Sequence, residues 1–100
     1  MKNLLLQLNK AFDNKIRLGI MSVLAVNRTV SFNHLKEMLE LTDGNLASHL
    51  KILEAAGYLR VHKSFSGRKP TTVYEITSEG NVAFSQHLKA LEEIIKQQES

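Results

Sequence analysis

The segment "DGNLASHLKILEAAGYL" (residues 43–59) begins polar, continues with apolar residues at helical spacing and reaches a glycine near its end. On a helical wheel Leu46, Leu50 and Leu53 fall within about 60° of one another. Asn45 and Ser48 fall on the far half, and His49 falls at the edge between the two halves. The pattern predicts a helix over 43–56 that buries one side and exposes small hydrogen-bonding groups near its start. Gly57 is the expected stop.

The segments around this helix predict a mainly α chain with a small β-hairpin. Apolar residues at helical spacing predict further helices over residues 1–12, 13–27, 32–41 and 78–98. Alternating stretches over 58–65 and 71–77 flank the turn-rich "SGRKP" (66–70), which predicts a hairpin. The β-branched residues 28–30 allow one additional short strand. The expected order is therefore helix, helix, short strand, helix, helix, hairpin, helix.

Length and composition limit the possible classes. One hundred residues predict a single domain over 1–100, divided here into an N-terminal helix (1–12), a body (13–77) and a C-terminal helix (78–98). The absence of cysteine excludes disulfides and thiolate metal sites and suits a reducing cytosol. The net charge of +3 leans only mildly toward anionic partners. No apolar run is long enough to predict a membrane span.

Two short helices joined by a tight turn, with the second exposing a polar front, are typical of a helix-turn-helix that enters the major groove of DNA. Asn can pair bidentately with adenine, and Ser or His can donate or accept at base edges, so Asn45, Ser48 and His49 are the candidate base-reading residues. We expect Arg68 in the hairpin turn to enter a minor groove and Lys69 to contact a phosphate. Further candidate backbone contacts are Arg28, His34, Lys36, Thr42 and Lys51.

The combination of "DGNLASHLKILEAAGYL" (43–59), "SGRKPTTVYEIT" (66–77) and "TSEG" (77–80) resembles the winged helix-turn-helix regulators of the MarR/ArsR superfamily, in particular their short stand-alone members. The similarity extends over roughly residues 13–90. It implies an α+β winged-helix fold in which 43–56 reads the major groove, 66–70 is the wing and the terminal helices form a homodimer. The chain departs from the ArsR-type metal sensors in having no cysteine, and from the larger MarR proteins in its shorter terminal helices.

Two apolar stripes near the chain ends exceed what a winged-helix body needs, and they predict a homodimer interface. The candidate dimerisation residues are Leu4, Leu5, Leu8, Phe12, Phe84, Leu88, Leu91 and Ile95. The alternative is that these residues belong to the core of one chain. Alternatives also stand for the DNA surface: Asn45 and Ser48 as a solvated helix face, His49 as a histidine at the core edge under the hairpin, and Arg68 and Lys69 as ordinary loop charges.

The sequence therefore predicts a cytoplasmic, nucleoid-associated transcriptional regulator, a homodimeric repressor that binds a palindrome in double-stranded DNA. The alternative is a winged-helix module that binds a protein, since Glu37, Glu40 and Asp43 near the reading helix would repel phosphate. The sequence shows no nucleophile–base pair, no paired carboxylates and no phosphate-binding glycine loop, so it does not predict an enzyme. The four histidines match no compact ligand spacing, so neither a metal nor a cofactor is expected. A small-molecule effector is compatible with the architecture but is specified by no residue.

Overall fold

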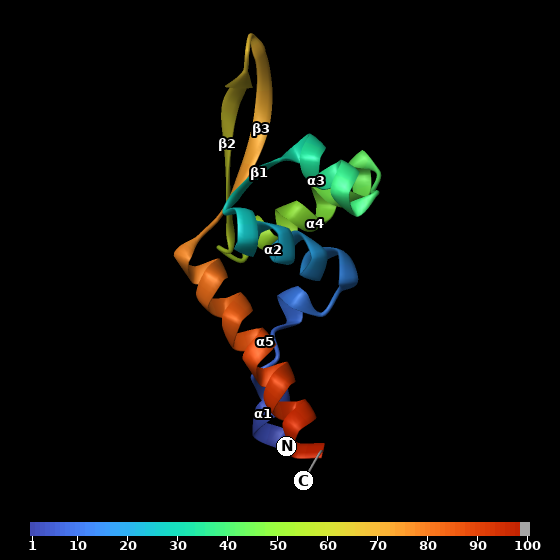
Figure 1. Cartoon of the computed structure of the whole chain (residues 1–100), viewed down its shortest axis with the longest axis vertical. Coiled ribbons are helices and arrows are strands. Elements are labelled where there is room, and N and C mark those ends of the chain that lie inside the picture. The colour runs from blue at the N-terminus through green and yellow to red at the C-terminus, as the bar shows by residue number, and fades with distance from the viewer. Residues whose placement is uncertain (99–100) are drawn as a thin grey trace.

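The computed structural model describes residues 1–98, and the molecule is elongated, with extents of 57 × 25 × 21 Å. Its elements are α1 (Lys2–Leu6), the 3₁₀ helix η1 (Lys10–Phe12), α2 (Lys15–Asn27), β1 (Thr29–Ser31), α3 (Phe32–Leu39), α4 (Asp43–Ala55), β2 (Leu59–Ser66), β3 (Lys69–Ile76) and α5 (Ser78–Gln98). In Figure 1 the β2–β3 hairpin projects from one end of the helical body, and α1 lies beside the last turns of α5 at the other end. The predicted winged-helix architecture is confirmed.

Side-chain caps fix the residues at which the main helices begin. Asn14, Ser31, Thr42 and Thr77 each accept a hydrogen bond from the backbone N–H three residues later, at 2.9–3.2 Å. Such a cap satisfies one of the first N–H groups of a helix, which have no partner within it. Ser31 begins α3 and Thr42 begins α4, and α5 spans the predicted residues 78–98.

The predicted continuous helix over 1–12 is wrong. α1 ends at Leu6, and Asn9 begins the separate turn η1 by accepting the N–H of Ala11 through its side chain at 2.9 Å. The backbone N–H of Asn9 donates to His87 Nδ1 at 3.0 Å, and its side-chain amide donates to the Tyr58 hydroxyl at 2.8 Å. These hydrogen bonds compete with the helical ladder, so the chain turns at this residue and α1 runs in a new direction.

The hairpin belongs to a three-stranded antiparallel sheet with the strand order β1-β3-β2. β1 pairs Val30 with Tyr74, and β2 pairs Ser66 with Lys69 beside the turn. The strands are longer and the loop shorter than predicted, because Gly67 adopts a positive φ of 65° that permits a two-residue connection. The sheet is anchored to the body at its β1 end, while the turn extends beyond it (Figure 1).

The core lies where α2, α3 and α4 meet the base of the sheet. Its fully buried side chains are Ile20, Met21, Leu24, Leu35, Leu46, Leu50 and Leu53. A Cβ at Gly19 would lie 3.2 Å from a methyl group of Leu39, so the close approach of α2 and α3 explains a glycine in mid-helix. A Cβ at Gly80 would lie 2.3 Å from the Tyr58 carbonyl oxygen, so the start of α5 can lie against this backbone only with glycine.

Candidate nucleic-acid interface

Helix α4 presents a free polar face, as its sequence predicts. Leu46, Leu50 and Leu53 are at most 1% exposed, whereas Asn45 and Ser48 on the other side are exposed. The apolar side is therefore fixed against the body and the polar side is left uncovered by the chain. This geometry is what a helix needs in order to enter a major groove without moving.

The side chains at the front of α4 keep hydrogen-bond donors and acceptors that are free to contact bases. The side-chain amide of Asn45 has no hydrogen bond to another group within residues 1–98. Ser48 donates its hydroxyl to the Asn45 carbonyl at 3.1 Å, which leaves the oxygen lone pairs as acceptors. A Cβ at Gly44 would meet no atom within 4 Å, so the space over the first turn is open. Asn45 thus offers a donor and an acceptor together, and Ser48 adds an acceptor.

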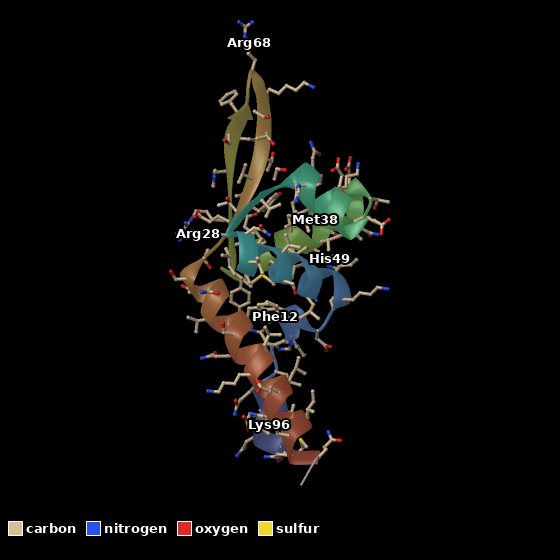
Figure 2. All side chains as sticks on the ribbon, viewed as in Figure 1. Phe12, Arg28, Met38, His49, Arg68 and Lys96 are labelled. Carbon is tan, nitrogen blue, oxygen red and sulfur yellow. The ribbon has the colours of Figure 1, made fainter. Side chains whose placement is uncertain are left out.

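His49 does not point free into the same space. Its Nδ1 lies 3.0 Å from Arg17 Nη1 of α2, and the residue is half-buried (Figure 2). One ring nitrogen is therefore occupied within the chain, and the predicted base-reading role of His49 stays a prediction that only Nε2 can serve. The alternative of a histidine at the core edge agrees with its partial burial, although its hydrogen-bonding partner is on α2. Local sequence patterns could not predict this pair, because the two residues lie 32 positions apart.

The β2–β3 hairpin forms the wing, and its tip is basic and exposed. Arg68 and Lys69 are exposed, and Arg68 lies at the far end of the molecule (Figure 2). Lower on the wing, the Lys63 ammonium donates to the Thr72 hydroxyl at 3.0 Å across the two strands. Phe65 is 70% exposed on the wing and was not singled out from the sequence. An exposed aromatic ring beside basic residues is a surface that can pack on a sugar–phosphate chain.

The remaining predicted backbone contacts on α3 and α4 differ in whether they are paired within the chain. Lys36 lies beside the first turn of α4, but its ammonium pairs with the Asp43 carboxylate at 2.9 Å, so phosphate must compete with this ion pair. Thr42 and Lys51 are exposed on α4 and its cap, and His34 is exposed on α3. Lys36 and Thr42 lie at the start of α4 and Lys51 lies on its exposed side, whereas His34 lies in the first turn of α3 beside β1. Their phosphate contacts stay predictions.

Arg28 is misplaced in the sequence prediction. Its Nε lies 3.5 Å from Glu75, whose other oxygen is 3.2 Å from Arg60. Glu75 and Tyr74 are adjacent residues of β3, and the Tyr74 ring lies 6.5 Å from the Phe32 ring of α3. Because neighbouring residues of a strand point to opposite faces, Arg28 lies on the face of the sheet turned away from α3. The local reason is the positive φ of 65° at Arg28, which ends α2.

The terminal segments also differ from the prediction. Phe12 and Phe84 are only 2% and 4% exposed, and their rings pack 5.3 Å apart in an edge-to-face contact. Both are core residues of the monomer, so their assignment to a dimer interface is wrong. Exposed apolar side chains nevertheless remain on these segments: Leu5, Leu6, Leu88, Leu91 and Ile95. Leu4 and Leu8 are half-buried.

His87 is a buried polar residue within this aromatic cluster. It is 6% exposed, and its ring packs 5.3 Å from the Phe12 ring. Burial lowers the pKa of His87 below its ordinary value, and the nearby Asp13 carboxylate partly opposes this effect. The neutral ring accepts the Asn9 N–H, so His87 holds η1 on α5.

Comparison with known proteins agrees with this geometry. Residues 16–95 match the family described as a winged helix DNA-binding domain. This chain belongs to that family. It therefore contains a DNA-binding helix-turn-helix with a wing, and it functions as a DNA-binding transcriptional regulator. Within the described residues, no helix has the length and apolar character required to cross a membrane.

Individual relatives support the assignment. An uncharacterized protein from Methanocaldococcus jannaschii is 38% identical over 87 residues, which cover 87% of this chain and 95% of the relative. The structure of a transcriptional regulator homologue from Pyrococcus horikoshii OT3 covers all of both chains with a TM-score of 0.89 and 34% identity. A regulator of the MarR family from Enterococcus faecalis V583 shares the fold, with a TM-score of 0.71, 23% identity and coverage of 89% and 82%.

Proposed function

We propose that this regulator is a homodimeric repressor that binds a palindromic operator with one α4 helix in each of two successive major grooves. The observation that carries the proposal is the free polar front of α4, fixed from behind by three buried leucines. Asn45 would pair with a base, preferably adenine, and Ser48 would accept from a neighbouring base edge. A repressor of this kind acts at chromosomal DNA, in the cytoplasm and at the nucleoid. No catalytic step is part of the proposal.

The wing and the flanking residues would add affinity. Arg68 at the tip would enter a narrow minor groove, and Lys69 would meet a phosphate. Lys51, Lys36, His34 and the hydroxyl of Thr42 would contact phosphates beside the major groove, with Lys36 exchanging Asp43 for a phosphate. Each phosphate that is neutralised releases counterions, so affinity should fall steeply with salt.

Dimerisation would use the end of the molecule opposite the wing. Leu5, Leu6 and Ile95 are between 53% and 75% exposed there, and Leu88 and Leu91 extend the apolar surface along α5. Two chains joined through this surface would each direct a wing and an α4 helix outward. A two-fold dimer of this kind matches the symmetry of a palindrome, with its half-sites one duplex turn apart.

The direct test is selection of bound duplexes from random DNA, followed by titration of the selected duplex at several salt concentrations. We expect an inverted repeat with half-sites about 10 bp apart and a binding curve that corresponds to one dimer per duplex. Sedimentation of the free protein should show a dimer, and replacement of both Leu88 and Ile95 by Ser should produce a monomer that binds DNA more weakly. Binding without sequence preference, or a monomer that occupies a single half-site at full affinity, contradicts the proposal.

A further inference from the structure

Arg17 of α2 makes polar contacts with both η1 and α4. Its Nε donates to the backbone carbonyl of Ala11 in η1 at 2.6 Å, and its Nη1 lies 3.0 Å from His49 Nδ1 on α4. Arg17 is itself half-buried, and its backbone N–H is held by the Asn14 cap. The guanidinium is therefore fixed from both ends between η1 and the reading helix.

The chemistry of this contact determines the state of the imidazole. A guanidinium carries only donors and is always charged, so the His49 Nδ1 beside it must be the acceptor. The proton of the neutral ring must then lie on Nε2. Within residues 1–98 no group hydrogen-bonds to Nε2, so the ring retains one N–H donor for an outside acceptor.

The position of His49 on α4 identifies that acceptor. His49 follows Asn45 by four residues, so the two side chains lie one turn apart on the same side of the helix. When Asn45 faces base edges, a residue one turn further along at the edge of the buried side faces the groove wall, where the phosphates lie. A neutral N–H donor at this point suits a phosphate oxygen.

We propose that Arg17 is a positioning residue for DNA binding, which holds His49 as the Nε2–H tautomer so that it donates to a DNA phosphate. The other end of the bridge is the Ala11 carbonyl, next to Phe12, whose ring packs on Phe84 of α5. One side chain thus links the segment that carries the terminal helices to the helix that reads DNA. The inference rests on the proposed placement of α4 in the major groove.

The first test needs no variant. Long-range ¹H–¹⁵N correlation spectra of the free protein at neutral pH should show His49 with its proton on Nε2 and an unprotonated Nδ1. Replacement of Arg17 by Lys should shift His49 toward a mixture of tautomers, because an ammonium on a single stem cannot reach both partners. A proton on Nδ1 in the wild-type protein overturns the inference, whether or not the protein binds DNA.

The second test is a double-mutant cycle on the selected duplex. Arg17→Lys should lower affinity about tenfold, the loss that one charge-assisted hydrogen bond accounts for, and should leave the salt dependence unchanged because the charge is retained. In a His49→Ala background the same substitution should have no further effect. His49→Gln, which keeps an N–H donor near the Nε2 position, should bind more tightly than His49→Ala.

The control is Lys15→Gln against Arg17→Gln, since both remove one cation from the start of α2 but Lys15 is exposed. We expect a clearly larger loss of affinity for Arg17→Gln, at matched melting temperatures. Equal losses from Arg17→Lys with and without His49 would show that Arg17 acts directly on DNA or through the fold, and would overturn the inference. A wild-type protein that binds no duplex would instead contradict the proposed function, and the tautomer measurement would still decide the Arg17–His49 contact.

Discussion

Helix α4 and the wing are two DNA-facing regions that are held in opposite ways. α4 is fixed by Leu46, Leu50 and Leu53, all essentially inaccessible to solvent, so its polar front has a defined position before DNA arrives. The outer half of the wing is exposed on both faces, and its side chains from Phe65 to Pro70 contact no core. A rigid support suits base reading, whereas a projecting hairpin can adapt to the width of a groove.

Truncation of a buried leucine of α4 should have the largest effect on the free energy of unfolding. Leu50→Ala removes a side chain that is 1% exposed and leaves a cavity, so the free energy of unfolding should fall by about 2–5 kcal/mol. Urea unfolding followed by circular dichroism measures this loss. A small chain has little stability to spare, so DNA binding should weaken at temperatures that the wild type tolerates. If stability were unchanged, α4 would not be clamped as described.

Asn45→Ala should affect binding without affecting the fold. The amide is exposed and makes no hydrogen bond within the described residues, so the melting temperature should stay the same. Binding to the selected duplex should weaken by about 1–3 kcal/mol per half-site, and the preference at one base position should be lost. Titration against duplexes that carry all four base pairs at that position is the measurement. Uniform weakening across the four would indicate a backbone contact instead of base reading.

Arg68→Ala tests the wing and should have a smaller effect. The side chain lies at the tip, far from the core, so stability should be unaffected (Figure 2). Binding should weaken by about 1 kcal/mol per half-site, and if each Arg68 also neutralises one phosphate, the slope of log K against log salt should become less steep by about 0.9 per half-site. Arg60→Ala is a matched control, because Arg60 lies on β2 but is paired with Glu75. Equal effects from the two substitutions would mean that the wing contributes only general charge.

The sequence predicts these two regions well because the signals are local. The cap at Thr42, the leucine spacing of α4 and the glycine at 67 all lie within a few residues of the structure that they determine. The errors concern contacts between distant residues. The break at Asn9 depends on Tyr58 and His87, 49 and 78 positions away. The partner of His49 and the sheet face of Arg28 likewise depend on how the elements pack together. The periodicity of apolar residues along the sequence does not predict such contacts.

The last prediction compares an exposed and a buried residue of the same strand. Phe65 and Leu59 both lie on β2, but Phe65 is 70% exposed and Leu59 is 3% exposed. Phe65→Ala should therefore change the free energy of unfolding by about 0.5 kcal/mol or less, whereas Leu59→Ala should cost about 2–5 kcal/mol. Parallel urea titrations compare the two. A large loss from Phe65→Ala would mean that the outer wing packs on the body in solution and cannot adapt freely to DNA. If the wing does contact DNA, Phe65→Ala should still weaken binding, because the ring is the largest apolar group near Arg68 and its loss removes packing against the sugar–phosphate chain.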